Sequence, residues 1–215
     1  MIKNVLLSLN LCTAVVYADS GFYIGAGAGY GSMTASTTNG YNYLDGTSSK
    51  NGNNMLGSVY MGYDFSHFVG TQIDYDYIAN AQFTSSTSSI TGVQNSFSVN
   101  EQVIDLAVTG HLPFSVFANS LSGASIFGKL GVGYSIINFS GGTVGSGVNQ
   151  VFTQSLPTFA QGLVPVLGIG AEYGIGSVGI RLEYNYIGTI TVSNGGQNVM
   201  NINNSIGLFS AFYHF

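Results

Sequence analysis

The feature that most constrains this chain is how charged and apolar side chains are sorted between alternate positions. Eight segments carry apolar residues at every second position, which is the period of a β-strand. The charged residues of these segments all fall on the opposite face: Asp74, Asp76, Asp105, Lys129, Glu172, Arg181 and Glu183. A soluble barrel has the reverse arrangement, with apolar side chains inside and charges outside. Because a charge facing the bilayer midplane costs about 2–4 kcal/mol, the sorting predicts strands with one face in lipid.

The eight segments define the predicted fold. They cover 22–30, 57–65, 69–77, 104–112, 126–136, 167–173, 178–186 and 207–215. Each is close to the ten residues or so that a tilted strand needs to cross a bilayer. Lipid also requires every backbone polar group to be paired, which a closed barrel achieves. The fold class predicted is therefore all-β, an eight-stranded antiparallel transmembrane up-and-down β-barrel.

Composition supports a surface that does not meet water. Charged residues make up 6% of the chain, while 45% of its residues are hydrophobic. An average globular domain has about 25% charged residues. The formal net charge is -5 and the sequence shows no basic patch, so nucleic acid is excluded as a partner.

The first 18 residues have the pattern of a secretory signal. Lys3 precedes an apolar stretch over 5–16, and the segment 16–18 offers a cleavage site after Ala18. The stretch is too short to span a membrane as a helix. We therefore expect a signal peptide at 1–18 and one barrel domain at 19–215. Cys12 leaves open a lipoprotein signal, although Leu11 before it is bulkier than that processing usually accepts.

The connections alternate in predicted length. Long loops rich in Ser, Thr, Asn and Gly are expected at 34–54, 79–96, 139–160 and 189–204. Short turns are expected at 64–68 and 174–178, and a longer turn at 112–124. Outer-membrane barrels have short periplasmic turns and longer outer loops. We therefore expect both termini on the periplasmic side and localisation in the bacterial outer membrane.

Several short motifs, taken in order, resemble the small outer-membrane barrels of the opacity-protein and outer-membrane protein A transmembrane type. They are GFYIG from Gly21, GYDF from Gly62, LPF from Leu112, KLGVGY from Lys129, GIGAEY from Gly168, RLEY from Arg181 and the terminal Phe215. The resemblance spans roughly 19–215. It implies that Tyr213 and Phe215 form the C-terminal signal read by the barrel-assembly machinery. Leu208 and Ser210 depart from that signal's usual polar residue and glycine.

The inward charges form a candidate network of Asp74, Asp105, Lys129, Glu172, Arg181 and Glu183. If a turn at 175–178 closes a hairpin, Glu172 lies opposite Arg181, and Lys129 falls near the level of Asp105. Buried charges need partners, and eight strands enclose an interior that side chains can fill. A salt-bridged plug is the favoured interpretation. A gated ion path and a catalytic role are the alternatives.

The histidines and the third loop give further candidates. His67, His111 and His214 map to the periplasmic end, and nothing in the sequence fixes their mutual distances, so no metal site is predicted. No catalytic set converges at the outer side, and no cofactor is expected. The third loop carries the contact candidates Phe139, Phe152, Leu156 and Phe159. They either fold over the barrel mouth, contact a host surface or another protein, or give lateral access to a hydrophobic ligand.

The leading functional hypothesis is a non-enzymatic outer-membrane surface protein, structural and adhesive through its outer loops, with a side-chain-filled lumen. Its expected partners are outer-membrane lipid, the barrel-assembly machinery, and a host surface or another protein. The alternative is a narrow channel or hydrophobic-solute transporter. An outer-membrane enzyme is the least favoured class, because the histidines map to the wrong end.

Overall fold

The computed structural model describes residues 21–37, 49–50, 54–84, 95–117, 123–144, 158–194 and 196–215. The predicted signal peptide at 1–18 lies outside these ranges. In the part of the chain that is described, no helix is long and apolar enough to cross a membrane.

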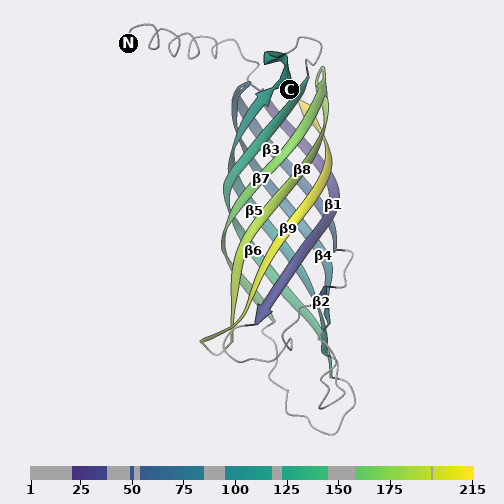
Figure 1. Ribbon diagram of the computed structural model, residues 1–215, viewed down its shortest axis with the longest axis vertical. Helices are drawn as coiled ribbons and strands as arrows, with labels where there is room; N and C mark the ends of the chain where they lie inside the picture. The colour runs from purple at the N-terminus through teal and green to yellow at the C-terminus, as the bar shows by residue number, and fades with distance from the viewer. Residues whose placement is uncertain are drawn as a thin grey trace, which may run out of the picture.

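Eight long antiparallel strands close into a barrel, as predicted (Figure 1). They are β1 (Gly21–Thr37), β3 (Asn54–Ser66), β4 (Val69–Thr84), β5 (Asn95–Pro113), β6 (Ala124–Val144), β7 (Phe159–Ile175), β8 (Val178–Asn194) and β9 (Gln197–His214). Each pairs with its neighbours in chain order, and pairing of β1 with β9 closes the barrel. The short strand β2 (Ser49–Lys50) adds to the end of β4.

The two ends of the barrel differ. The turn end holds the start of β1, the end of β9, and the connections 67–68, 114–123 and 176–177. The second of these includes a 3-10 turn, η2 (Phe114–Val116). The loop end holds the connections 38–53, 85–94, 145–158 and 195–196. The short turns at 67–68 and 176–177, the longer turn at 114–123 and the first three loop-end connections follow the prediction, and the last connection does not.

The predicted loop at 189–204 is wrong. β8 and β9 stay paired as far as Asn194 and Gln197, so a tight turn at 195–196 joins them. Gly196 has a positive φ of 83°, a conformation that glycine adopts without steric cost and that suits a hairpin turn. The segment was expected to be a loop because its Ser, Thr and Asn residues are typical of loops. In the barrel Thr191, Ser193, Asn201 and Asn203 form part of the polar outer face of two strands.

The strands are also longer than expected, running from 13 residues in β3 to 21 in β6. About ten residues cross a bilayer, so the excess projects beyond it. Nearly all of the excess lies at the loop end. Predicted loops at 34–54, 79–96 and 139–160 therefore begin too early, because β1, β4 and β6 continue to Thr37, Thr84 and Val144.

The outer face has two zones. The belt is the apolar zone next to the turn end, where large hydrophobic side chains are exposed from Phe22 to Tyr30 on β1 and from Val178 to Tyr186 on β8. At the edge of the belt that faces the loop end, the exposed residues are tyrosines: Tyr30, Tyr77, Tyr134 and Tyr186. Such aromatic girdles mark membrane interfaces.

The second zone, the collar, is the outward face between these tyrosines and the loop end. Its exposed or half-buried side chains include Thr34, Ser36, Gln82, Ser98, Asn100, Gln102, Asn138, Ser140, Gln161, Thr191, Ser193, Asn201 and Asn203. Most side chains behind the collar are apolar and form one buried cluster, beside the buried polar residues Glu101 and Asn204. It includes Met33, Leu56, Ile78, Phe83, Val99, Val103, Ile137, Val164, Ile187, Val192, Ile202 and Ile206. The loop half is therefore built like a water-soluble barrel, and the turn half like a membrane barrel.

Candidate functional site

Arg181 lies in the lumen of the turn half and is 2% exposed. Its Nε and Nη2 donate to Oε2 of Glu172 at 3.2 and 2.9 Å, and its Nη1 donates to Oε1 of Gln72 at 2.6 Å. The register of β7 and β8 pairs Glu172 directly with Arg181, as the predicted hairpin requires. A planar guanidinium suits this forked arrangement of acceptors, because it presents several donors in one plane.

Four aromatic rings enclose the same guanidinium. The ring centroids of Phe127, Tyr60, Phe212 and Tyr23 lie 4.6, 5.0, 5.3 and 5.4 Å from Arg181 Cζ. Rings this close attract a cation through their quadrupoles, and the attraction strengthens when water is excluded. The Tyr23 hydroxyl also donates to Gln72 Oε1 at 2.8 Å, which fixes the amide beneath the guanidinium.

Each ring fits against a glycine on the neighbouring strand. A Cβ placed on these glycines would collide with the facing ring. The directly paired residues are Gly25 with Tyr60, Gly62 with Tyr23, Gly170 with Phe127, and Gly179 with Phe212. Inward glycines at these positions therefore make room for the large aromatic side chains of the lumen. The rings themselves were not predicted, although inward aromatic residues opposite inward glycines are a signal in the sequence that could have indicated them.

Lys129 is the centre of a second cluster, deeper in the lumen. Its Nζ lies 2.6 Å from Asp74 Oδ2, 3.0 Å from Asp105 Oδ1 and 3.8 Å from Glu183 Oε1. All four side chains are buried. Gln72 donates to Asp74 Oδ1 at 2.7 Å, so the two clusters form one hydrogen-bonded network. The structure thus brings together all six residues of the network expected from the sequence.

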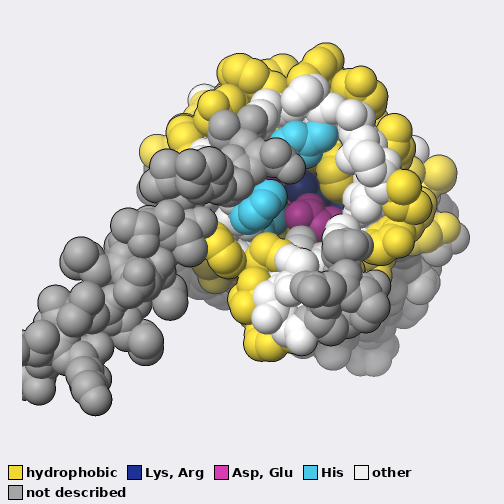
Figure 2. Space-filling view, turned by 90° about the horizontal axis from the view of Figure 1, so that it is seen from above, with side chains coloured by type: hydrophobic (Ala, Val, Ile, Leu, Met, Phe, Trp, Pro, Cys, Tyr) yellow, Lys and Arg dark blue, Asp and Glu magenta, His cyan; other side chains and the backbone are white. Residues whose placement is uncertain are grey.

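The network opens at the turn end into a vestibule of about 560 Å³ (Figure 2). Figure 2 shows histidine and acidic side chains in this mouth, ringed by hydrophobic ones. His111 Nδ1 lies 3.0 Å from Glu172 Oε1, and its Nε2 lies 3.8 Å from Asp64 Oδ1. His214 Nε2 lies 3.0 Å from Asp64 Oδ2. Asp64 was not among the predicted site residues, because it belongs to a segment expected to be a turn.

The histidines were expected at this end, and their arrangement bears on metal binding and catalysis. Among the described residues, no group of three or more His, Cys, Asp or Glu side chains is arranged to hold a metal ion. A serine, a glutamate and a histidine do converge, because Ser125 Oγ donates to Glu172 Oε1 at 2.8 Å. The glutamate lies between the other two, however. A nucleophilic serine needs the histidine as its immediate partner.

A further polar contact lies on the loop-end side of the Lys129 cluster. Glu101 is buried and accepts hydrogen bonds from Ser135 Oγ at 2.6 Å and from Asn204 Nδ2 at 2.9 Å. Beyond Glu101 the lumen is occupied by the apolar cluster of the loop half. Polar groups therefore extend from the vestibule into the lumen, and packed hydrocarbon separates them from the loop end.

The predicted loop candidates are divided by the structure. Phe139 lies on β6, not in a loop, and packs against the buried cluster of the loop half. Phe159 is the first residue of β7 and is 55% exposed. Phe152 and Leu156 lie outside the described residues. Tyr213 and Phe215, the predicted assembly signal, are exposed at the turn end with ring centroids 5.1 Å apart.

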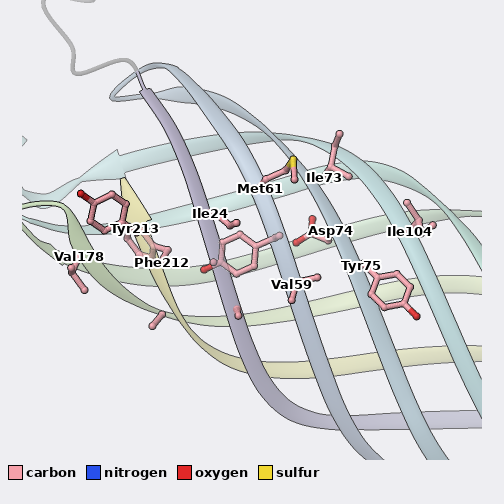
Figure 3. A pocket seen from close by; sticks show the side chains of 14 residues that line it. Ile24, Val59, Met61, Ile73, Asp74, Tyr75, Ile104, Val178, Phe212 and Tyr213 are labelled. Atoms are coloured by element: carbon pink, nitrogen blue, oxygen red, sulfur yellow. The ribbon is translucent and has the colours of Figure 1, made fainter. Parts of the chain in front are cut away.

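The membrane-facing surface carries one further feature, a shallow apolar groove of about 640 Å³ (Figure 3). Its lining includes Ala26 and Ala211, which are paired across β1 and β9. Small residues there leave space that larger neighbours such as Met61 and Tyr213 do not fill.

The closed strand order and the lipid-facing belt define a membrane-spanning β-barrel. The chain belongs to the family of OmpA-like transmembrane domains, which matches residues 17–215. It is therefore a protein of the bacterial outer membrane. The turn end is then periplasmic and the loop end faces outward. No curated protein sequence is similar enough to count as a match.

Solved structures show the same fold at low sequence identity. Neisserial surface protein A is 14% identical, with a TM-score of 0.54 over 91% of this chain and 99% of that one. A major outer-membrane protein from Thermus thermophilus is 12% identical, with a TM-score of 0.51 over the same shares. The attachment invasion locus protein Ail of Yersinia pestis, solved with the heparin analogue sucrose octasulfate, is 14% identical with a TM-score of 0.49, again over 91% and 99%.

Proposed function

We propose that this protein is a non-enzymatic surface protein of the outer membrane, whose lumen is closed by its own side chains. The observation that carries the proposal is the apolar cluster behind the collar. Val99, Val103 and Ile137 in this cluster are each 0% exposed. An ion crossing this zone would have to leave water for packed hydrocarbon, at a high cost in free energy.

A catalytic role is not part of the proposal. The Ser125, Glu172 and His111 cluster is the nearest approach to a hydrolytic set in the described residues, and its order does not activate the serine. Arg181 also holds Glu172 in an ion pair, which leaves that carboxylate unsuited to act as a general base.

A contact role for the outer connections completes the proposal. Phe159 is exposed at the start of β7, and we assign the predicted contact role to the segment 145–159 that contains Phe152 and Leu156. A contiguous exposed apolar patch marks an interaction site, and we propose that Phe159 forms such a patch together with Phe152 and Leu156. Phe139 is left out of this contact role, because it packs against the buried cluster of the loop half. Tyr213 and Phe215 are proposed as the contact with the barrel-assembly machinery.

Conductance of the refolded protein in planar bilayers tests the closed lumen. Correct folding is first established by a gel mobility that shifts on boiling. We expect the folded protein to insert without producing defined openings. Steady unitary openings would overturn the closed lumen and favour the alternative, a narrow channel.

The contact role needs a separate test on cells. A variant with 38–53, 85–94 and 145–158 replaced by tight turns is compared with the intact chain at equal surface levels. We expect the variant to lose binding to a partner surface or to weaken the outer membrane. The contact role is wrong if both properties are unchanged.

A further inference from the structure

The outer surface of the barrel is free of charge wherever the structure describes it. Lys50 lies on β2, and its side chain is not described. The other charged residues of the described ranges all line the lumen or the vestibule: Asp64, Asp74, Asp76, Glu101, Asp105, Lys129, Glu172, Arg181 and Glu183. Among the side chains that the structure describes, neither the belt nor the collar therefore offers a cation to a lipid phosphate.

The collar begins at the level where the outer leaflet ends its hydrocarbon. Tyr77 on β4 is paired with Gln102 on β5, which in turn is paired with Ile136 on β6, so girdle and collar adjoin without a gap. The eight residues of β6 from 137 to 144 then rise about 20 Å, at roughly 3.3 Å per residue and a tilt of about 40°. In an outer membrane this height is occupied by the sugars of the glycolipid leaflet.

The side chains of the collar suit uncharged sugars. Amide and hydroxyl groups both donate and accept hydrogen bonds, as sugar hydroxyls do. Phosphate is typically bound by arginine or lysine, through charge-assisted hydrogen bonds. Asn138, Gln161 and Asn203 are collar residues exposed or half-buried on three strands, and they illustrate the pattern.

The collar is held rigid from both sides. Cross-strand hydrogen bonds link Thr191 with Asn201 and Ser98 with Ser140, at 3.0 and 2.9 Å. The apolar cluster supports the same strands from within. A surface that is already ordered loses little conformational entropy on binding.

We propose that the collar binds the saccharide portion of the outer-leaflet glycolipid through uncharged hydrogen bonds, independently of lipid phosphate. This inference goes beyond the proposed function, because it concerns the strands and not the loops. It also makes the glycolipid a specific partner of the barrel. The belt, in contrast, requires only the hydrocarbon of any lipid.

The test compares the stability of the full chain in vesicles of three compositions. These are phosphatidylcholine alone, phosphatidylcholine with a lipopolysaccharide truncated to lipid A and its innermost sugars, and phosphatidylcholine with a full-core lipopolysaccharide. We expect the urea midpoint of unfolding to rise with the full core beyond the truncated form. The rise should persist in 0.5 M sodium chloride, since uncharged hydrogen bonds are not screened by salt.

Variants locate the effect. Asn138→Ala, Gln161→Ala and Asn203→Ala are combined in one protein, and a control combines Ile73→Ala, Ile104→Ala and Leu130→Ala in the belt. The preference is the ratio of the unfolding equilibrium constants in truncated and in full-core glycolipid. Each substitution in the collar variant removes one hydrogen bond to the sugars, so we expect this preference to fall by about tenfold or more. The belt variant should keep the preference even if its overall stability drops.

Several outcomes would overturn the proposal. They are equal midpoints with the two glycolipids, a rise that disappears in high salt, and a collar variant that keeps the full preference. Binding of the protein to neutral glycans on another surface, without any effect of the full core, would assign the collar to an external partner instead. None of these outcomes depends on conductance, so they test the collar proposal independently of the proposal that the lumen is closed.

Discussion

At the scale of single residues, Arg181 is the group on which most lumen contacts converge. Its guanidinium reaches Glu172 and Gln72 and lies within 5.4 Å of four ring centroids. Burying a cation is costly unless its partners compensate, and here acceptors lie in its plane while rings surround it. The residue therefore joins six strands, β1, β3, β4, β6, β7 and β9, to β8.

Replacing Arg181 tests this convergence. Arg181→Ala leaves Glu172 without its guanidinium partner, so we expect the free energy of unfolding to fall by about 3–5 kcal/mol. Arg181→Lys keeps the charge but loses the forked geometry and the flat stacking surface, so its loss should be smaller but measurable. Urea titration of the refolded proteins in vesicles measures both. An unchanged midpoint for Arg181→Ala would contradict the structural role.

At the scale of strands, the ring and glycine pairs determine how closely neighbours can approach. On β7, Gly170 faces the ring of Phe127 on β6, whereas an added Cβ on Gly162 of the same strand would meet nothing within 4 Å. The same residue type therefore has different roles along one strand. Well-packed interiors tolerate added methyl groups poorly.

Gly170→Ala should push Phe127 off its place over Arg181. We expect a loss of about 1–3 kcal/mol in stability from overpacking. Gly162→Ala is the matched control, because its added methyl group has open space, and it should be close to neutral. Equal effects of the two substitutions, measured by thermal unfolding in the same detergent, would show that strand propensity and not packing governs this site.

At the scale of the whole molecule, the barrel changes character along its axis. The turn half has lipid outside and charges inside, and the loop half has amides outside and hydrocarbon inside. Interior and exterior exchange polarity at one level because water replaces lipid as the surrounding medium there. The tyrosine girdle marks this level.

Two arginine substitutions on β6 locate the membrane boundary. Leu130 is 65% exposed in the belt, and Asn138 lies eight residues further along in the collar. Leu130→Arg should cost about 2–4 kcal/mol in vesicle-embedded protein, because lipid cannot solvate the charge. Asn138→Arg should cost less than about 1 kcal/mol, as expected near or beyond the interface. Similar losses for both would place the bilayer elsewhere along the barrel.

The sequence contains a signal for this exchange of polarity between the two halves of the barrel, but the exchange was not predicted. At Tyr77 and Ile78, at Ile136 and Ile137, and at Tyr186 and Ile187, two apolar residues stand side by side. The first of each pair faces lipid and the second faces the interior. Expecting apolar residues only on the lipid face ended each predicted strand at this point. The polar residues that followed were then assigned to loops.

The sequence by itself determined the class of fold, since period-two alternation with every charge on one face leaves few alternatives to a barrel in lipid. It also located the inward charges and the pairing of Glu172 with Arg181, because a tight turn imposes that register. Only the tertiary structure decided which rings surround Arg181, how Asp64 joins His111 and His214, and that hydrocarbon fills the loop half. Those contacts join strands far apart in the chain, and closure of the barrel alone brings them together.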